Sequence, residues 1–380
     1  NKTPAIRFKG FTDTWEQRKL GDMCDEFQSG KSIKASDITD SGEYAVYGGN
    51  GFRGYTDTYN HDGDYALIGR QGALCGNMNF SSGKAYFTEH AVAVHGNADN
   101  DTLFLYYLLD LMNLGQYSGQ SAQPGLAVNK IIQLKTKAPK LDEQRLISSF
   151  FKQLDSLITL HQRKYDKLIQ FKAAMLQKMF PQNGANKPEI RFKGFTDAWE
   201  QRELSDEFER FIVPMRDKPK QFGGNLPWTR IEDIEGKYLN DSLSGQYVTD
   251  ETVKQMNLKI IPKDSLIVSS SATFGVVAVV TQDLITNQTF IGLVPNDNET
   301  LDYWYAFFYS NGARRYMKSE SAGSTIFYIA RESFEKMPIK IPLKSEMLKI
   351  GAYFDTIDHL ITLHQRKCDK YKSIKAGLIR

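Results

Sequence analysis

LITLHQRK, residues 157–164, occurs a second time without change at residues 360–367. A longer stretch is also duplicated: PAIRFKGFTDTWEQRKL, residues 4–20, returns at residues 188–204 as PEIRFKGFTDAWEQREL, with fourteen of seventeen positions identical. The residues between these shared ends, 21–139 and 205–342, show little similarity to each other. The chain is therefore a tandem duplication in which the flanking segments are alike and the regions between them differ. This pattern predicts a protein that docks the same partner twice and reads two different things.

Each copy of LITLHQRK lies within a long helical pattern. Residues 142–180 contain neither Gly nor Pro, and their apolar positions recur with a heptad period. With Ile147 at an a position, the d positions are Phe150, Leu157, Lys164 and Phe171, and the second copy fits the same register. One polar layer interrupts each seam, His161 with Lys164 and His364 with Lys367.

A helix of this length cannot cover its apolar seam alone, so we predict that the two copies pair as an antiparallel coiled coil. The alternative is that each helix packs on its own variable region. The residues assigned to helix pairing are Leu154, Leu157, His161, Leu168, Ile357, Leu360, His364 and Tyr371.

The two variable regions share one order of elements. Short β-prone runs at 44–47, 65–68, 84–87 and 91–94 precede a helical stretch at 102–114, and runs at 258–261, 265–268, 275–280 and 290–294 precede another at 301–309. Ile68 matches Ile267, and Gly76 matches Gly275. We therefore expect divergent copies of one domain with a twisted, partly barrel-like sheet.

The predicted fold class is α+β. It comprises two tandem α/β domains in a pseudo-twofold internal repeat, separated and joined by two long antiparallel coiled-coil helices. The expected boundaries are 1–139 for the first domain, 140–180 for the first helix and 181–187 for a linker, followed by 188–342 for the second domain and 343–380 for the second helix. Aromatic residues of the repeated 4–20 and 188–204 segments are expected to pack each domain against a helix: Phe8, Phe11, Trp15, Phe192, Phe195 and Trp199.

Composition narrows the class of protein. A net charge of +3 and a pI near 8.5 permit nucleic-acid binding without requiring it. No run of eighteen apolar residues is present, so no membrane segment is predicted, and the first residues do not form a signal peptide. The odd number of cysteines, Cys24, Cys75 and Cys368, gives no disulfide framework and indicates a reducing cytoplasm.

Several local motifs resemble catalytic ones but lack the required context. Gly49–Gly54 satisfies a dinucleotide-binding glycine pattern, yet the following residues open no helix that could hold a pyrophosphate. Asp233, Glu235 and Lys237 crowd into five residues and are interpreted as a solvated loop rather than a metal-dependent nuclease site. The histidines have no zinc-ligand spacing. We therefore predict a chain without catalytic residues and without a bound metal.

The duplicated P-x-I-R-F-x-G-F segment, the duplicated L-I-T-L-H-Q-R-K helix and the dissimilar middles occur together over the whole chain. This combination resembles the specificity (S) subunit of type I restriction-modification enzymes. One departure is that the second helix stops at Arg380, short of the position that corresponds to Phe180.

The resemblance implies that each variable region is a target recognition domain for one half of an asymmetric, bipartite, gapped DNA site. It also implies that the helices set the spacing and dock two modification (methyltransferase) subunits. Double-stranded DNA and those subunits are the expected partners, with restriction (endonuclease/translocase) subunits in the full complex. No cofactor is expected in this chain, because S-adenosylmethionine, ATP and Mg are expected only on the partner subunits.

A reader of duplex DNA needs cations for phosphates and amide, hydroxyl or guanidinium groups for base edges. Loops of both regions supply them. The DNA-binding candidates of region one are Lys31, Lys34, Asn50, Arg53, Arg70, Gln71, Gln120 and Gln123. Those of region two are Arg216, Lys218, Lys220, Arg230, Ser271, Thr273, Ser324 and Thr325.

Two other classes of function remain open at the level of sequence. A non-catalytic coiled-coil adaptor would bind two different proteins and show little salt-sensitive affinity for DNA. An enzyme whose site is assembled across the two halves would need an acid, base or metal set that the sequence does not reveal.

Overall fold

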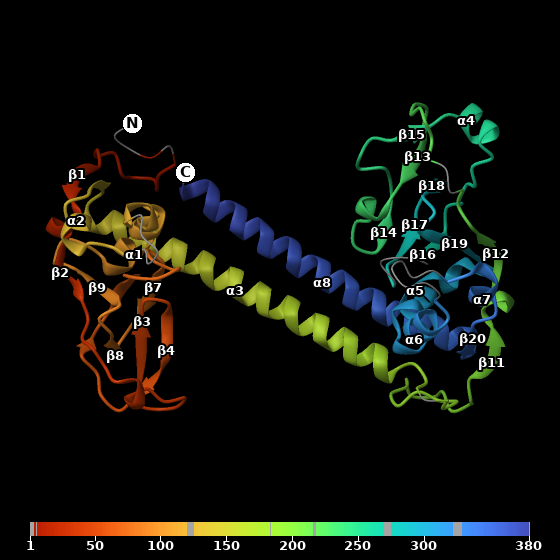
Figure 1. Cartoon of the computed structure of the whole chain (residues 1–380), viewed down its shortest axis with the longest axis horizontal. Helices are drawn as coiled ribbons and strands as arrows, with labels where there is room; N and C mark the ends of the chain where they lie inside the picture. The colour runs from red at the N-terminus through yellow and green to blue at the C-terminus, as the bar shows by residue number, and fades with distance from the viewer. Residues whose placement is uncertain are drawn as a thin grey trace. The chain divides into compact units, whose positions relative to one another are not determined.

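The structure is a computed structural model that describes residues 4, 6–119, 125–182, 184–215, 218–269, 275–321 and 329–379. The chain forms two compact units, one made of residues 1–159 with 368–380 and the other of residues 160–367. Each unit holds one variable region, one lead segment (residues 4–20 or 188–204) and portions of both long helices (Figure 1). The expected boundaries, which assign each long helix to a domain of its own, remain a description of the sequence repeat.

The strands and α-helices of the first lead segment and variable region are short. They are β1 (Glu16–Lys19), β2 (Cys24–Ser29), β3 (Tyr44–Gly48), β4 (Gly51–Thr56), β5 (His61–Asp62), β6 (Tyr65–Gly69), β7 (Met78–Ser81), β8 (Lys84–Phe87), β9 (Ala91–Gly96), α1 (Thr102–Leu111), α2 (Val128–Ile131) and β10 (Lys135–Ala138).

Two sheets make up the first variable region. One is antiparallel with the order β2-β9-β6-β7, and the other has the order β4-β3-β8-β5 with a parallel β3–β8 pair. Every residue of β6 is buried, because α1 packs over Ala66 and Ile68 while Tyr65 and Leu67 face a second cluster with Phe87 of β8. Burial on both faces explains why this strand is a continuous apolar run.

The second variable region repeats this plan with additions. Its elements are β11 (Glu200–Glu203), β12 (Phe208–Ile212), β13 (Leu226–Thr229), β14 (Tyr238–Leu239), β15 (Tyr247–Val248), α4 (Asp250–Gln255), β16 (Ser265–Ser269), β17 (Val277–Val280), β18 (Ile285–Thr286), β19 (Phe290–Pro295), α5 (Leu301–Tyr309), α6 (Asn311–Ser319), α7 (Arg331–Glu335) and β20 (Pro338–Ile341).

The main sheet of the second unit has the order β12-β19-β16-β17-β14, so its first four strands repeat β2-β9-β6-β7. Helix α5 covers it as α1 covers the first sheet, and a smaller sheet, β15-β13-β18, lies beside it in the same unit (Figure 1). The shared strand order agrees with common descent of the two regions. Each region holds two main sheets instead of the single barrel-like sheet that we expected.

Two details of the sequence prediction were wrong. Ile68 lies in the cluster under α1, whereas Ile267 lies in the cluster on the opposite face of its sheet, so Ile68 corresponds to Val268. A one-residue shift in a strand exchanges its faces, and faint similarity could not resolve that shift. The run 258–261 is not a strand: Asn257 has a left-handed backbone (φ 50°), and only Ile261 forms an isolated bridge, with Leu284.

Both lead segments are fixed by the same contacts. Strand β1 pairs with β10, and β11 pairs with β20. The guanidinium of Arg7 donates to both carboxylate oxygens of Glu143 at 2.6 and 2.7 Å, and Arg191 contacts both oxygens of Glu346 at 2.7 Å. Both glutamates are buried near the start of a long helix. The duplicated lead segments therefore make the same two contacts in each unit, a strand pair and an ion pair with the start of a long helix.

The long helices are α3 (Leu141–Lys178) and α8 (Lys344–Ile379). In the second unit, Nδ1 of His161 lies 2.8 Å from Nδ1 of His364, and Lys172 forms an ion pair with Asp358 at 2.5 Å. Partner numbers fall on α8 as they rise on α3, so the helices are antiparallel there. In the first unit, Lys375 forms the matching ion pair with Asp155 at 2.6 Å.

The helix seam differs from the predicted register. Leu154, His161 and Ile357 at a positions are buried, and Leu157, Leu168, Leu360, His364 and Tyr371 are half-buried. However, the d positions Phe150, Lys164 and Phe171 are exposed, as is Lys367 in the second helix. Phe151, Ile158 and Tyr165, four residues after each a position, are half-buried instead. The polar layer therefore consists of the two histidines, without the lysines.

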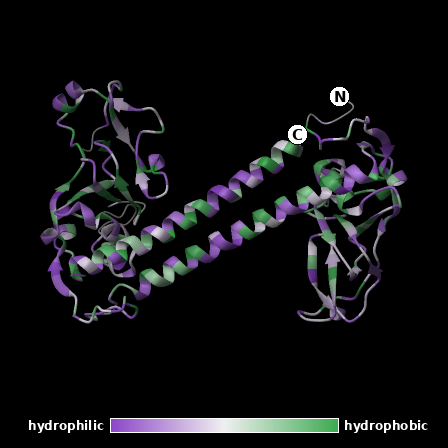
Figure 2. Cartoon of the chain, turned by 180° about the vertical axis from the view of Figure 1, so that it is seen from behind, coloured by the Kyte–Doolittle hydropathy of each residue, from purple (hydrophilic) through white to green (hydrophobic). Residues whose placement is uncertain are grey.

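Figure 2 shows apolar and polar residues alternating along both long helices. Within the described parts of the chain, no helix combines the length and the hydropathy needed to cross a bilayer.

Candidate nucleic-acid interface

Four chain segments meet at one edge of the first variable region: the end of β2, the turn between β3 and β4, the end of β6 and the turn between β8 and β9. The backbone N–H of Arg70 donates to the carbonyl of His90 at 2.9 Å, and that of Lys31 donates to the carbonyl of Phe87 at 3.0 Å. The Thr88 N–H donates to the carbonyl of Tyr47 at 2.9 Å. These bonds bring strand ends that are distant in sequence to a single edge.

Glycine makes this close approach possible. A Cβ added to Gly49 would lie 3.3 Å from the Gln71 carbonyl oxygen and 3.2 Å from that of His90. A Cβ on Gly48 would lie 2.5 Å from Cδ of Arg53. Residues 49–50 therefore form a tight connection from β3 to β4, and Gly51 and Gly54 lie within β4 and do not precede a helix.

Five predicted residues lie at this edge, and we call them the region-one edge: Lys31, Asn50, Arg53, Arg70 and Gln71. Arg70 is half-buried, and its guanidinium donates to the Ser29 hydroxyl at 3.3 Å; the other four are exposed. The edge thus combines three cations with two amides, which are the groups that contact phosphates and the edges of guanine and adenine. Lys34 lines a separate open cleft with Asp37 and Asp57.

The second variable region holds two cations near the buried ring of Trp228, which lies on β13. Nζ of Lys218 lies 5.6 Å from the ring centroid of Trp228 and 5.4 Å from that of Phe222, and Cζ of Arg230 lies 5.8 Å from the Trp228 ring. We call these four residues the region-two patch. Lys220 is exposed on the same segment. Cations held over aromatic faces near one surface suit a polyanion better than an apolar ligand.

Seven predicted DNA contacts lie outside the described residues. They are Gln120, Gln123, Arg216, Ser271, Thr273, Ser324 and Thr325.

Of the three residues interpreted as a solvated loop, Glu235 is exposed, but the interpretation is wrong for Asp233 and Lys237. Asp233 is buried and accepts backbone N–H bonds from Arg230 at 2.7 Å and Leu243 at 2.8 Å. Lys237 is buried and pairs with Asp302 and Asp355, both at 2.5 Å. Burial alone lowers the pKa of Lys237, but the hydrogen bonds to these two carboxylates hold it above its ordinary value. These contacts are structural.

Candidates for metal or nucleophilic chemistry are few. Among the described residues, no group of three or more His, Cys, Asp or Glu side chains could hold a metal ion. Burial raises the pKa of the Cys24 thiol to about 12, which disfavours the nucleophilic thiolate.

Sequence reasoning missed His90 and Ser29, which belong to the same edge as Arg70. The signal for His90 was the polar Thr88-Glu89-His90 turn between two β-prone runs. The side chain of His90 lies 3.5 Å from the carboxylate of Glu89.

Comparison with known proteins agrees with this architecture. Residues 12–170 and 196–372 each match the family described as "Type I restriction modification DNA specificity domain". The chain belongs to this family. Both matches run from a lead segment into a long helix, so the family's domain corresponds to the repeat that the sequence contains.

Relatives of this specificity-domain chain include the type I restriction enzyme EcoprrI specificity subunit of Escherichia coli. It is 40% identical over 156 residues, which is 40% of this chain and 39% of the relative. The putative MjaX specificity subunit of Methanocaldococcus jannaschii is 23% identical over 287 residues, 72% of this chain and 66% of the relative. The aligned segments therefore span between about two fifths and two thirds of these relatives.

The same fold occurs in a solved type I restriction-modification S subunit from M. genitalium. The superposition has a TM-score of 0.65 at 15% identity and covers 99% of this chain and 98% of that one. Because the identity is low, this likeness concerns the fold of the specificity family and not its individual contacts.

Proposed function

We propose that this chain is the DNA sequence-specificity subunit of a type I restriction-modification complex, in which each variable region reads one half of an asymmetric, bipartite, gapped site. The observation that carries this proposal is the region-one edge, where three cations and two amides converge. It is supported by the family match and by a second, different cationic surface at the matching half of the chain. Two unlike surfaces on one repeated frame would read two unlike half-sites.

We further infer that the long helices set the gap and dock two modification subunits. Helix α3 has 38 residues, which corresponds to a length of about 57 Å at 1.5 Å per residue. Each unit exposes large apolar side chains on its helix portions, which favours protein partners there. They are Leu146, Phe150 and Ile374 in the first unit and Leu160, Phe171 and Leu363 in the second.

The proposal assigns no catalysis to this chain. S-adenosylmethionine, ATP and Mg belong to the modification and restriction subunits. The role of this chain is to select the DNA that those subunits act on.

The test is selection of bound duplexes from a random DNA pool, with the chain alone and with its modification subunit. Two unlike motifs at a fixed separation are expected. Failure to recover any preference in either form would contradict the proposal and favour a protein adaptor, whose affinity for DNA would depend little on salt.

Substitutions can show which residues contact each half-site of the DNA. Arg70→Ala with Gln71→Ala should relax preference in one half-site only, by about 1 to 3 kcal/mol for each lost bidentate contact. Arg230→Ala should relax only the other half-site. Lys31→Ala is the matched control at the same edge, because loss of a lysine–phosphate contact should weaken binding to all sequences alike. Equal loss of preference in both half-sites from Arg70→Ala and Gln71→Ala would reject the assignment of the region-one edge.

A further inference from the structure

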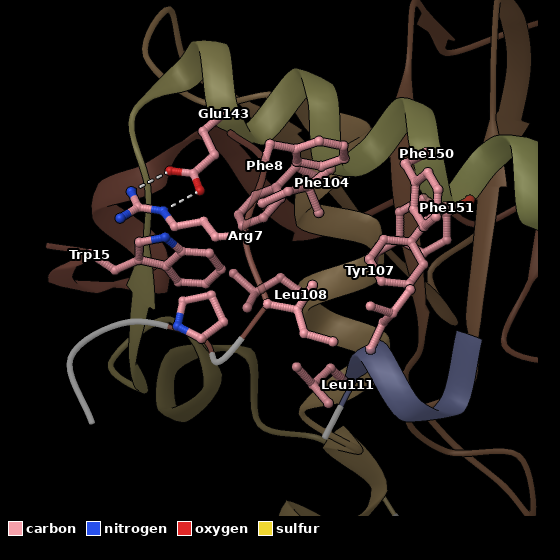
Figure 3. Close-up of a pocket in the computed structure, with 14 residues that line it drawn as sticks. Arg7, Phe8, Trp15, Phe104, Tyr107, Leu108, Leu111, Glu143, Phe150 and Phe151 are labelled. Atoms are coloured by element: carbon pink, nitrogen blue, oxygen red, sulfur yellow. Dashed lines mark hydrogen bonds and ion pairs between the residues drawn. The ribbon is translucent and has the colours of Figure 1, made fainter. Parts of the chain in front are cut away.

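Two pockets differ in the groups that line them. The pocket in the first unit has mostly apolar walls, and Figure 3 shows the aromatic rings of Trp15, Phe104, Tyr107 and Phe151 around it. A cleft of about 420 Å³ in the second unit is polar. The described residues that line it are three cations and three amides: Arg314, Arg315, Lys318, Gln177, Gln182 and Asn311. This composition suits an anion, and none of the proposed DNA contacts lies in the cleft.

The rotation of helix α6 places two of these cations side by side. Ala313 and Met317 are buried in the core of the second unit. Arg314 and Lys318 follow them by one residue each and are exposed. Because they are four residues apart, they share one face of the helix. The packing of α6 therefore directs both cations into the cleft.

Contacts on two sides hold the guanidinium of Arg314. Its Cζ lies 4.9 Å from the ring centroid of Tyr309, and its Nη2 donates to the carbonyl of Gly275 at 3.3 Å. A Cβ added to Gly275 would lie 3.1 Å from Nε of Arg314, so the glycine leaves room for the guanidinium. Of the described residues, none with a carboxylate pairs with Arg314 or Lys318. A cation that is already held in place loses little conformational freedom when it binds an anion.

Arg314 lies against the connection between β16 and β17, which corresponds to the connection between β6 and β7. One backbone hydrogen bond closes each connection. The N–H of Gly69 donates to the carbonyl of Asn77 at 2.8 Å, and the N–H of Ser269 donates to the carbonyl of Val276 at 2.8 Å. The connection in the first unit begins with the arginine and the glutamine of the region-one edge. Arg314 therefore lies at the part of the second region that matches the region-one edge.

The two units place different groups over this connection. In the first unit, a Cβ on Gly76 would lie 2.2 Å from the backbone nitrogen of Gly115, so bare backbone packs there. In the second unit, a guanidinium of α6 covers the matching Gly275. Residues 102–119 contain no Lys or Arg, whereas residues 311–318 contain three. The segment after the covering helix therefore supplies cations in the second unit only.

The neighbouring sequence agrees with a site for an anion. A serine follows β16 where Arg70 follows β6, so α6 brings to this edge a guanidinium that the strand end does not supply. Residues 270–274 and 322–328 adjoin Gly275 and α6 in the sequence and contain no Asp or Glu. Both stretches hold residues that we predicted to contact DNA.

We propose that Arg314 and Lys318 bind backbone phosphates of the half-site that the second region reads. This inference rests on the proposed function and adds a contact that no candidate of the sequence analysis includes. The amides of the cleft donate further N–H bonds to phosphate oxygens. Because phosphates are the same at every base pair, α6 supplies affinity and orientation, and other residues supply base preference.

The experiment measures how the affinity for DNA depends on salt. The probe is the duplex recovered by selection with the unaltered chain. Arg314→Gln with Lys318→Gln removes two cations, so the slope of log affinity against log salt should become shallower by about 1.8. The unaltered chain should therefore lose about tenfold more affinity than this variant between 50 and 200 mM salt. The matched control is Lys259→Gln with Lys263→Gln, two exposed lysines before the other end of β16, and it should keep the slope.

Two single variants separate the possible roles of the cations. Arg314→Lys keeps the charge without the planar fork, so it should keep both the salt slope and the half-site preference. Lys318→Gln alone, at a position that contributes nothing to the core, should lower the slope by about half as much as the pair.

Two outcomes would overturn the phosphate contact. They are a loss of preference in the second half-site from Arg314→Lys, and equal slopes for the α6 pair, the control pair and the unaltered chain. If the unaltered chain still selects two motifs, either outcome leaves the proposed function standing. Failure of the unaltered chain to select any motif would reject both the proposed function and this contact.

Discussion

The pair of imidazoles at His161 and His364 is the only polar layer in the described helix seam of the second unit that is made by two copies of one repeated residue. Their Nδ1 atoms lie 2.8 Å apart, so one ring donates and the other accepts. Burial lowers the pKa of both imidazoles below the ordinary value, and the charges of Lys164 and Lys367 act in the same direction. The folded chain therefore favours neutral rings.

The lowered pKa of the two imidazoles determines how the stability of the folded chain depends on pH. A lowered folded-state pKa gives stability that is present above the unfolded-state pKa of about 6.5 and is lost as the pH falls toward the folded-state value. We expect the free energy of unfolding of the wild type, measured with denaturant, to fall more between pH 7.5 and pH 5.5 than that of a His161→Asn, His364→Asn variant. His359→Gln, at an exposed position of α8, is the control and should follow the wild type. Identical pH dependence in all three chains would contradict the shift.

Lys237 offers a second test at a single residue. Its side chain is 7% exposed and its ammonium group bridges Asp302 and Asp355, so removal of the charge leaves two carboxylates facing each other. Lys237→Met should lower the free energy of unfolding by about 1.5 to 3 kcal/mol, the range for hydrogen bonds to charged groups. Lys263→Met, at an exposed lysine of the same unit, should change it little. A solvated loop would predict no difference between the two variants.

The types of residue that suit DNA binding were easier to predict than which of these residues lie close together in the fold. Lys31, Arg53 and Gln71 were recognisable as groups that suit DNA, but their convergence depends on which strand ends share an edge. That is decided by the order β2-β9-β6-β7 and by the parallel β3–β8 pair, both of which join segments distant in sequence. Ser29 and His90 join the same edge through contacts between segments that are distant in sequence, and only His90 had a local signal, the polar turn at 88–90.

Among the elements, the long helices were the most predictable. A heptad pattern, broken in each copy by one polar layer, predicted both α3 and α8 to within about two residues at each end. The seam was less predictable, because Lys172 buries its stem and reaches Asp358 while the more apolar Phe171 is exposed. Hydropathy alone cannot distinguish a lysine that packs along its stem from one that is solvated.

The exposed apolar residues of these helices give a prediction at the scale of the element. Leu160→Asp with Phe171→Asp should weaken binding of a modification subunit by at least about tenfold, which corresponds to 1.4 kcal/mol. Because both side chains are 45% exposed, the unfolding midpoint should change little. The matched control is Gln170→Asp, an exposed neighbour of Phe171 on the same helix. Undiminished binding, measured by calorimetry, would remove this face from the docking surface.

At the scale of the whole molecule, the duplication makes both units variations on one plan. The lead segment, the glutamate at a helix start and the lysine–aspartate pair between helices occur in each. The regions between the lead segments and the helices differ, since the second has β14, α4 and a three-stranded sheet where the first has the four-stranded sheet β4-β3-β8-β5.

The proposed spacing role can be tested by lengthening both helices together. Four residues inserted after Lys164 and after Lys367 move a seam position onto the position four residues later, which also faces the partner helix. Each helix grows by about 6 Å, so the gap between half-sites should widen by about two base pairs, with the half-sites unchanged. Insertion into one helix alone should instead destabilise the pair. Selection of bound duplexes measures the gap, and an unaltered gap would contradict the role.

The first unit is assembled from opposite ends of the chain, residues 1–159 and 368–380. During synthesis, Asp155 must wait for Lys375 to leave the ribosome before their ion pair can form. At about 5 to 20 residues per second, the intervening stretch takes roughly 10 to 40 s to translate. For that interval the nascent first half presents an uncovered helix seam, so we expect it to be a substrate for chaperones.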